Sequence, residues 1–243
     1  NGNCIYVEAG DARLLFVAGI SCMQAAARLA GFGRDISRVD ALVISHDHAD
    51  HVRCAGIYQR KFGIPLYITE KTLEAARSCH DLGRLHDVCH FRAGAVIRIG
   101  GISVETIPTP HDGADGAAFI VDDGRSRLGI FTDLGHVFAD LKSALSSVDA
   151  ALVESNYDPD MLAGGPYPRY LKKRIAGPGG HLSNIESAEL IARHGTRLRW
   201  ACIGHLSEQN NTAELSLRTH RGVNAGMTYH VAGRYGAGEL LTV

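Results

Sequence analysis

The feature that most constrains this chain is the heptapeptide at residues 45–51, Ser-His-Asp-His-Ala-Asp-His. It holds three imidazoles and two carboxylates, and it directly follows the apolar run 41–44. A rigid strand fixes the point at which a following loop begins, so the loop's side chains are delivered to one place. Neutral imidazole nitrogens and carboxylate oxygens are preferred donors for zinc and manganese. The heptapeptide therefore indicates a metal site, and a polar turn that is merely rich in histidine is the weaker alternative.

The composition is that of an ordinary globular protein, with 243 residues, 45% hydrophobic and 21% charged. We expect a single domain over residues 1–243, lacking a few N-terminal residues because the chain does not begin with Met. The net charge of -1 gives no general attraction to nucleic acid, so such binding requires a local patch. No apolar run approaches the roughly 20 residues of a membrane span. The six cysteines form no CxxC pair, and without a signal segment they favour reduced thiols in a cytoplasm.

Hydrophobic periodicity predicts alternating strands and helices. The expected strands cover residues 4–8, 13–17, 39–45, 65–68, 95–99, 102–106, 117–122, 126–132, 150–154, 199–203, 223–230 and 239–243. The expected helices cover residues 51–62, 71–78, 141–145, 184–194 and 214–219, together with one that Ser21 caps and that runs to Leu29. The strands come in two sets, each followed by helices, which predicts an α/β (α+β) domain of two packed sheets with helices outside.

Three further candidate ligands each lie just beyond a predicted strand: His111, Asp133 and His205. Each one alone has an ordinary explanation, because a polar residue at a strand end is common in any fold. Their combination with the heptapeptide, in this order, is much more specific.

This order resembles the metallo-β-lactamase-fold hydrolases over nearly the whole chain, which implies a four-layer αββα sandwich. The resemblance implies two divalent ions, zinc or manganese, and a metal-bridging hydroxide as the nucleophile. It assigns His46, His48 and His111 to one ion, Asp50, His51 and His205 to the other, and Asp133 to both. The oxygen-reducing branch of the superfamily carries Glu where this chain has His48, so an oxidoreductase is disfavoured.

Several later runs, at residues 154–158, 165–174, 180–184 and 204–211, look like the YycJ (WalJ) branch, bacterial enzymes regarded as 5′-to-3′ DNA exonucleases. A basic run with interleaved tyrosines suits phosphates and base stacking, so the DNA backbone is the expected partner, although a solvated basic loop is the alternative. The candidate substrate-binding residues are Tyr167, Arg169, Lys172, Lys173, Arg174 and Asn184, with Tyr170 between them.

Three residues are predicted to act in catalysis: Asp50, His181 and Glu154. Asp50 is expected to orient the hydroxide. His181 follows Gly179 and Gly180 at the expected start of a helix, where free N–H groups attract a phosphate. A similar histidine works beside a glutamate in the tRNA-processing ribonuclease Z branch. His181 is therefore expected to protonate the leaving oxygen or clamp the scissile phosphate, with Glu154 orienting it, unless it is a mere helix cap.

The chain departs from the family pattern at Val17, where members usually carry Asp behind the histidine-rich loop. Loss of such a carboxylate commonly lowers metal affinity or activity by about 10–100-fold. We therefore expect this chain to bind its metals less firmly than its relatives. A second histidine-rich stretch, with His80, His86 and His90, matches no tetrahedral zinc spacing and is expected to be a solvated helix and loop.

The main functional hypothesis is a two-metal phosphodiesterase that degrades DNA. The alternative is hydrolysis of a small β-lactam, lactone or thioester by the same ions, although such a neutral substrate has no need of the basic run. A DNA-binding or scaffold protein that has lost catalysis through the change at Val17 is a third possibility, disfavoured because all seven predicted ligands are present.

Overall fold

The computed structural model describes residues 2–243, which divide into two compact units. The first unit holds the chain up to Pro108, residues 113–117 and residues 234–237, and the second holds the remainder. The mixed α/β class with two sheets is confirmed. That the two units form one domain stays a prediction. None of the helices in residues 2–243 has both the length and the apolar character needed to cross a membrane.

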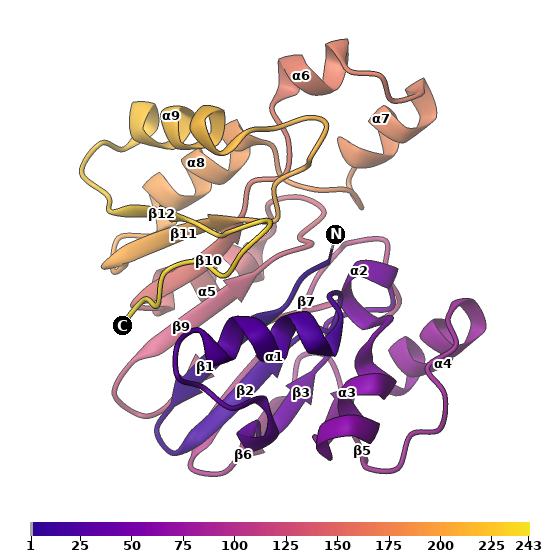
Figure 1. Ribbon diagram of the computed structural model, residues 1–243. Coiled ribbons are helices and arrows are strands. Elements are labelled where there is room, and N and C mark those ends of the chain that lie inside the picture. The colour runs from indigo at the N-terminus through magenta and orange to yellow at the C-terminus, as the bar shows by residue number, and fades with distance from the viewer. Residues whose placement is uncertain (1) are drawn as a thin grey trace. The chain divides into compact units, whose positions relative to one another are not determined.

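The first unit contains a five-stranded sheet in the order β1-β2-β3-β4-β5 (Figure 1). Its first two strands form an antiparallel hairpin, and β2 to β5 run parallel. Parallel strands bring their carboxyl ends to one edge of a sheet, and the histidine-rich loop leaves β3 at that edge. The strands are β1 (Ile5–Ala9), β2 (Ala12–Phe16), β3 (Ala41–Val43), β4 (Leu66–Ile68) and β5 (Val88–His90), and a hairpin of β6 (Val96–Ile99) and β7 (Ile102–Pro108) follows.

Helices of the first unit share one apolar core with this sheet. The core joins Leu42 and Leu66 of the strands to Leu29, Tyr58 and Ala76 of three helices. As predicted, Ser21 caps the first helix, where its side chain accepts the N–H of Gln24. The helices are α1 (Cys22–Ala30), α2 (Ala49–Val52), α3 (Ala55–Phe62) and α4 (Glu70–Cys79), with a short 3-10 turn at Ile36–Arg38.

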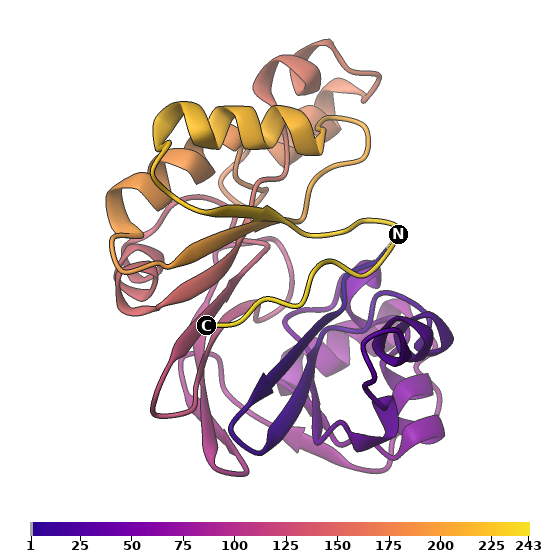
Figure 2. The same ribbon diagram turned by 60° about the vertical axis from the view of Figure 1, so that its left-hand side comes forward.

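The second unit has the strand order β12-β11-β10-β9-β8, in which β9 to β12 are parallel and β8 pairs antiparallel with β9. Helix α8 packs against α9, and the two lie along the same side of β11 and β12 in both views (Figures 1 and 2). The strands are β8 (Ala117–Asp122), β9 (Arg127–Phe131), β10 (Ala150–Glu154), β11 (Trp200–Gly204) and β12 (Tyr229–Val231). The helices are α5 (Ala139–Ser147), α6 (Pro159–Gly164), α7 (Arg169–Ile175), α8 (Asn184–His194) and α9 (Ala213–Val223).

Several predicted elements are corrected by the structure. Residues 239–243 are not a strand, and the strand predicted at 223–230 is confined to Tyr229–Val231. The predicted helix 51–62 is two helices, which are separated at Arg53 and Cys54. The stretch predicted as a solvated helix and loop contains β5. Proline and glycine around residues 159–168 hid α6 and α7 from the periodicity argument.

Candidate metal centre and catalytic residues

The histidine-rich loop turns into a helix as it ends, because His48 is the N-cap of α2. His46 and His51 are each 1% exposed, and their ring centroids lie 4.2 Å apart. The ring of His48 lies 4.5 Å from that of His46. Asp50 is more open, with a side chain that is 45% exposed. The four predicted ligands of this loop therefore lie together, as two buried rings beside two more accessible groups.

Polar neighbours hold this loop in place. The Nδ2 group of Asn3 donates to Asp50 Oδ2 at 3.1 Å and lies 3.0 Å from Nε2 of His51. The backbone N–H of Ala18 donates to the carbonyl of His51. Asp47 also helps to hold the loop, because its Oδ1 accepts the backbone N–H of Ala114. Sequence reasoning missed Asn3, because nothing in the chain's pattern links it to a loop over 40 residues away.

In the second unit, the parallel register of β9, β10 and β11 explains why distant residues converge. Asp133 follows β9, Glu154 ends β10 and His205 follows β11, so all three lie at the carboxyl edge of the sheet. Asp133 and His205 both have left-handed backbones, with φ of 58° and 55°. Such strained conformations in non-glycine residues are concentrated at functional sites.

Glu154 is a fully buried carboxylate at the centre of this group. Its Oε2 accepts the backbone N–H of Asp133 at 2.8 Å, and its Oε1 accepts that of Leu182 at 2.7 Å. Nδ1 of His181 lies 3.0 Å from Oε2, and Nδ1 of His205 lies 3.2 Å from it. Burial alone would raise the pKa of Glu154, but the charges and hydrogen bonds of the two histidines lower it to about 2. The ionised carboxylate only accepts, so both rings donate Nδ1–H and leave Nε2 available.

His111 is oriented in the same way by a backbone carbonyl. Its Nδ1 donates to the carbonyl oxygen of Gly180 at 2.8 Å, which fixes the proton there. Nε2 of His111 then lies 3.6 Å from Oδ1 of Asp133, and Nε2 of His205 lies 3.5 Å from the same oxygen. One carboxylate oxygen of Asp133 thus lies near Nε2 of both histidines.

The position of His181 differs in one respect from the sequence prediction. Helix α8 begins at Asn184 with Ser183 as its N-cap, so His181 lies two residues before the cap. Glu186 and Ser183 form a capping box, the backbone N–H of His181 donates to Ile175, and that of Leu182 donates to Glu154. The N–H groups of His181, Leu182, Ser183 and Glu186 at this helix start therefore already have acceptors.

The basic run forms α7, a helix with no buried residue. Arg169 and Lys173 are exposed, and Tyr170 is 76% exposed. The other two cations are engaged within the unit: Lys172 donates to the carbonyl of Ala163 at 2.7 Å, and Arg174 makes a bidentate pair with Asp112 at 2.6 and 3.0 Å. This second-unit surface therefore offers two cations and a tyrosine to a ligand more readily than it offers Lys172 and Arg174.

Asn184 lies in a buried network of hydrogen bonds. It is fully buried, its Oδ1 accepts from Ser155 and Asn211, and its Nδ2 donates to Asn211. A buried amide with these partners supports the fold, and the predicted role of Asn184 in substrate binding stays a prediction. Tyr167 is half-buried in the segment that precedes α7.

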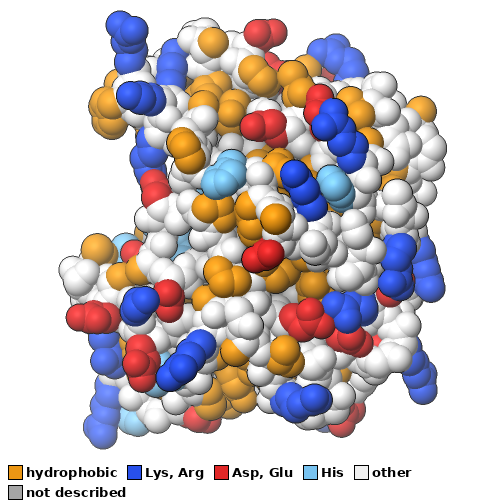
Figure 3. All heavy atoms as spheres, turned by 180° about the vertical axis from the view of Figure 1, so that it is seen from behind, with side chains coloured by type: hydrophobic (Ala, Val, Ile, Leu, Met, Phe, Trp, Pro, Cys, Tyr) orange, Lys and Arg blue, Asp and Glu red, His pale blue; other side chains and the backbone are white. Residues whose placement is uncertain are grey.

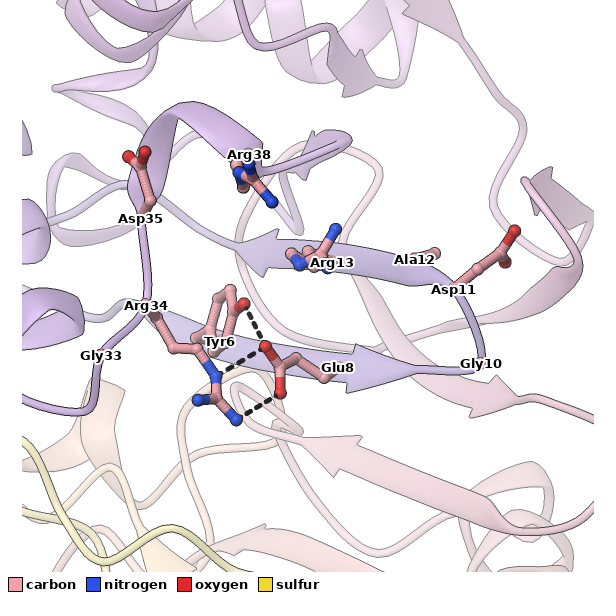
Figure 4. Close-up of a pocket in the computed structure, with 10 residues that line it drawn as sticks. All are labelled: Tyr6, Glu8, Gly10, Asp11, Ala12, Arg13, Gly33, Arg34, Asp35 and Arg38. Carbon is pink, nitrogen blue, oxygen red and sulfur yellow. Dashed lines mark hydrogen bonds and ion pairs between the residues drawn. The ribbon is translucent and has the colours of Figure 1, made fainter.

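A wide surface pocket of about 580 Å³ lies in the first unit, between the β1–β2 hairpin and residues 33–38 (Figure 4). It includes none of the predicted site residues. Its most prominent charges neutralise one another, since Glu8 pairs with Arg34 at 2.7 Å and accepts from the hydroxyl of Tyr6 at 2.8 Å. The pocket therefore presents no unbalanced charge from these groups.

Comparison with known proteins identifies the family. The profile described as "Beta-lactamase superfamily domain" matches residues 12–202. The metallo-β-lactamase fold protein YhfI from Bacillus subtilis superposes with a TM-score of 0.76 at 17% identity, covering 98% of this chain and 90% of that protein. The chain belongs to the β-lactamase superfamily and has the metallo-β-lactamase fold.

Two curated members of the superfamily are similar over most of their length. Exodeoxyribonuclease WalJ of Streptococcus pneumoniae is 34% identical over 223 residues, which are 90% of this chain and 82% of WalJ. Exodeoxyribonuclease YycJ of Bacillus anthracis is 32% identical over 218 residues, which are 88% of this chain and 82% of YycJ. The branch suggested by the sequence runs is thus confirmed.

The donor groups of the second unit fit the divalent ions that the superfamily implies. One oxygen or nitrogen atom from each of Asp133, Glu154, His181 and His205 lies within 4.8 Å of the others. Carboxylates and imidazoles are the donor types that zinc and manganese accept. The ligand assignment and the catalytic roles stay predictions.

Val17, where the resemblance leads us to expect Asp, has a strained backbone. Its φ is 58°, although it is β-branched and buried. Such a conformation costs about 1–3 kcal/mol, and Asp and Asn tolerate it better than valine does. The N–H of Val17 donates to Val43 at 2.9 Å, and the next residue donates to His51. Val17 therefore has a backbone conformation that Asp or Asn would adopt at a lower cost.

We expect Val17→Asp to raise the zinc affinity of the protein by about 10-fold, because it adds a carboxylate behind the loop and relieves backbone strain. Val17→Asn is the control, since it relieves the same strain without adding charge. Calorimetric zinc titration and thermal unfolding of both variants separate the two effects. Unchanged metal occupancy and turnover in Val17→Asp would show that position 17 does not limit the site.

Proposed function

We propose that this protein is a metal-dependent hydrolase that degrades DNA as a 5′-to-3′ exonuclease. The observation that carries the proposal is the similarity to two exodeoxyribonucleases, each of which the chain matches over 82% of its length. The geometry of His181, Glu154 and Asp133 supports phosphodiester hydrolysis, because it joins a proton-carrying imidazole to a predicted metal ligand. Hydrolysis of a small β-lactam, lactone or thioester is not favoured by these relatives.

Two divalent ions, zinc or manganese, are proposed to be bound by the seven predicted ligands. His46, His48 and His111 would hold one ion, Asp50, His51 and His205 would hold the other, and Asp133 would contact both. The ions would lower the pKa of the attacking water and stabilise negative charge on the phosphate. The support from this chain is the fixed tautomer of His111 and His205, whose Nε2 atoms lie 3.6 and 3.5 Å from Asp133.

His181 is proposed to supply the proton that the leaving oxygen needs. Its Nδ1 is held by Glu154 at 3.0 Å and lies 3.9 Å from Asp133 Oδ1, so the ring is kept beside the predicted bridging ligand. The buried carboxylate stabilises the protonated ring until Nε2 gives up its proton. Asp50, which is accessible in its own unit, is proposed to orient the attacking water.

The DNA backbone is proposed to bind at the exposed side of α7, through Arg169 and Lys173, with Tyr167 and Tyr170 available for stacking. A local patch is necessary because acidic and basic side chains are interspersed on the face in Figure 3 and the net charge is only -1. Lys172 and Arg174, which are engaged by Ala163 and Asp112, would support this helix. A cytoplasmic location is proposed because the six cysteines form no CxxC pair and are expected to be reduced thiols.

Duplex DNA labelled at either its 5′ or its 3′ end tests the proposal. With zinc or manganese, a 5′-to-3′ exonuclease releases the 5′ label at once as a short product, whereas the 3′-labelled strand shortens progressively. Asp133→Ala is the control for a contaminating nuclease. Absence of nucleotide release by the wild-type protein, or equal release by Asp133→Ala, would overturn the proposal. Nitrocefin measured in parallel reports on the small-molecule alternative.

A further inference from the structure

Ser45 lies immediately before the predicted ligand His46 and is almost fully buried. Its Oγ is 2.9 Å from Nδ1 of His46 and 3.2 Å from Nδ1 of His51. One hydroxyl therefore contacts two imidazoles that are assigned to different metal ions. Sequence reasoning gave this serine no role, because a hydroxyl next to a metal motif is unremarkable without the geometry.

The proton position on His51 follows from its other neighbour. Asp50 is an acceptor when ionised, so the Asn3 atom that faces it at 3.1 Å is the donating Nδ2. The same Nδ2 lies 3.0 Å from Nε2 of His51, which must then present a lone pair. The proton of the neutral ring is consequently on Nδ1, and it is donated to Ser45 Oγ. In this structure the lone pair of Nε2 faces Asn3, and a metal ion bound to His51 would take the place of that N–H.

The hydrogen bonds still open to the hydroxyl of Ser45 decide which nitrogen of His46 carries the proton. Ser45 Oγ has two lone pairs and one hydrogen, and His51 uses one lone pair. If Ser45 gave its hydrogen to Nδ1 of His46, the proton of that neutral ring would be on Nε2, and neither nitrogen could bind a metal. A metal-binding His46 must therefore donate its own Nδ1–H to the second lone pair of Ser45.

We propose that Ser45 is a positioning residue that accepts Nδ1–H from both His46 and His51 and so directs Nε2 of each ring toward a metal ion. The inference rests on the proposed metal site but not on the DNA substrate. Hydrogen bonds of this kind orient ligating imidazoles and raise their basicity. A single neutral hydroxyl would thus orient one ligand of each ion.

Three variants of the full chain test this role by zinc titration. Ser45→Ala is expected to weaken zinc binding by about 10–100-fold, the usual effect of losing such a partner. Ser45→Thr keeps the hydroxyl and is expected to restore most of the affinity. Ser187→Ala is the matched control: it also removes a buried hydroxyl bonded to an imidazole, 3.2 Å from Nε2 of His220, which is not a predicted ligand. Its zinc affinity is expected to equal that of the wild type.

Nitrogen-15 NMR of the histidine rings gives a readout that a general loss of stability does not move. In the zinc-loaded wild type, His46 and His51 should both show slowly exchanging Nδ1–H protons, and Ser45→Ala should lose both while Ser187→Ala retains them. Wild-type zinc affinity and unchanged Nδ1–H signals in Ser45→Ala would overturn the inference, as would a wild-type protein that binds no zinc. Zinc binding that depends on Ser45 in a protein without nuclease activity would contradict the proposed substrate but support this role.

Discussion

Replacing Glu154 by glutamine is expected to lower nucleotide release by about 100-fold or more. The glutamine oxygen can still accept the N–H of Leu182, but its amide would then present hydrogens to Asp133, His181 and His205, which are all donors toward this position. Unmet buried donors cost about 1–3 kcal/mol each, so the free energy of unfolding should fall as well. Turnover, zinc content and thermal unfolding measure the three consequences.

Glu186→Gln is the matched control for this substitution. Glu186 also accepts hydrogen bonds in the second unit, from the N–H and hydroxyl of Ser183, but it does so in a capping box, where glutamine serves as well as glutamate. It should retain wild-type turnover and stability. A Glu154→Gln protein that keeps half or more of the wild-type turnover would show that the buried carboxylate does not organise the site.

Replacing His181 by alanine is expected to lower DNA cleavage by about 10²–10⁴-fold, the range for loss of a general acid. The loss should nearly disappear with a p-nitrophenyl ester of thymidine 5′-phosphate, because p-nitrophenolate leaves without needing a proton. Turnover of both substrates by the wild type and His181→Ala measures this difference. If His181 instead clamps the phosphate, both substrates should lose activity equally.

His136→Ala controls for disturbance of the neighbouring segment. His136 is exposed, and its Nδ1 donates to the carbonyl of Pro178 at 2.8 Å, a residue close in sequence to His181. Its removal should leave the ratio of the two activities unchanged. If His181→Ala cleaved DNA at the wild-type rate, His181 would have only a structural role in the segment before α8.

The sequence predicted the elements whose physical cause is local or periodic. Ser21 caps α1, the strand Ala150–Glu154 has the predicted bounds, and α8 begins where predicted, because capping and hydrophobic period act within a few residues. The sequence also placed Asp133 and His205 just after predicted strands. Because β9, β10 and β11 pair in parallel, these two residues lie at the same edge of the sheet.

What the sequence could not supply depends on contacts between distant residues. Arg174 was predicted to bind phosphate, but whether its guanidinium is engaged depends on Asp112, some 60 residues earlier. Asn184 carries no sign in the sequence that its amide is buried against Asn211. Asn3 and Ser45 gained their significance only from the distances to two imidazoles. The strand predicted at 239–243 failed because an apolar run alone does not provide a pairing partner.

The central claim, that two divalent ions at these ligands support DNA hydrolysis, is tested most directly by titrating metal into chelator-treated protein while nucleotide release is measured. The account predicts no release without metal and a rise that saturates at two equivalents of zinc or manganese per chain. Asp133→Ala should remain inactive throughout the titration. Nucleotide release by the metal-free protein, or activity that is indifferent to the added metal, would contradict the account.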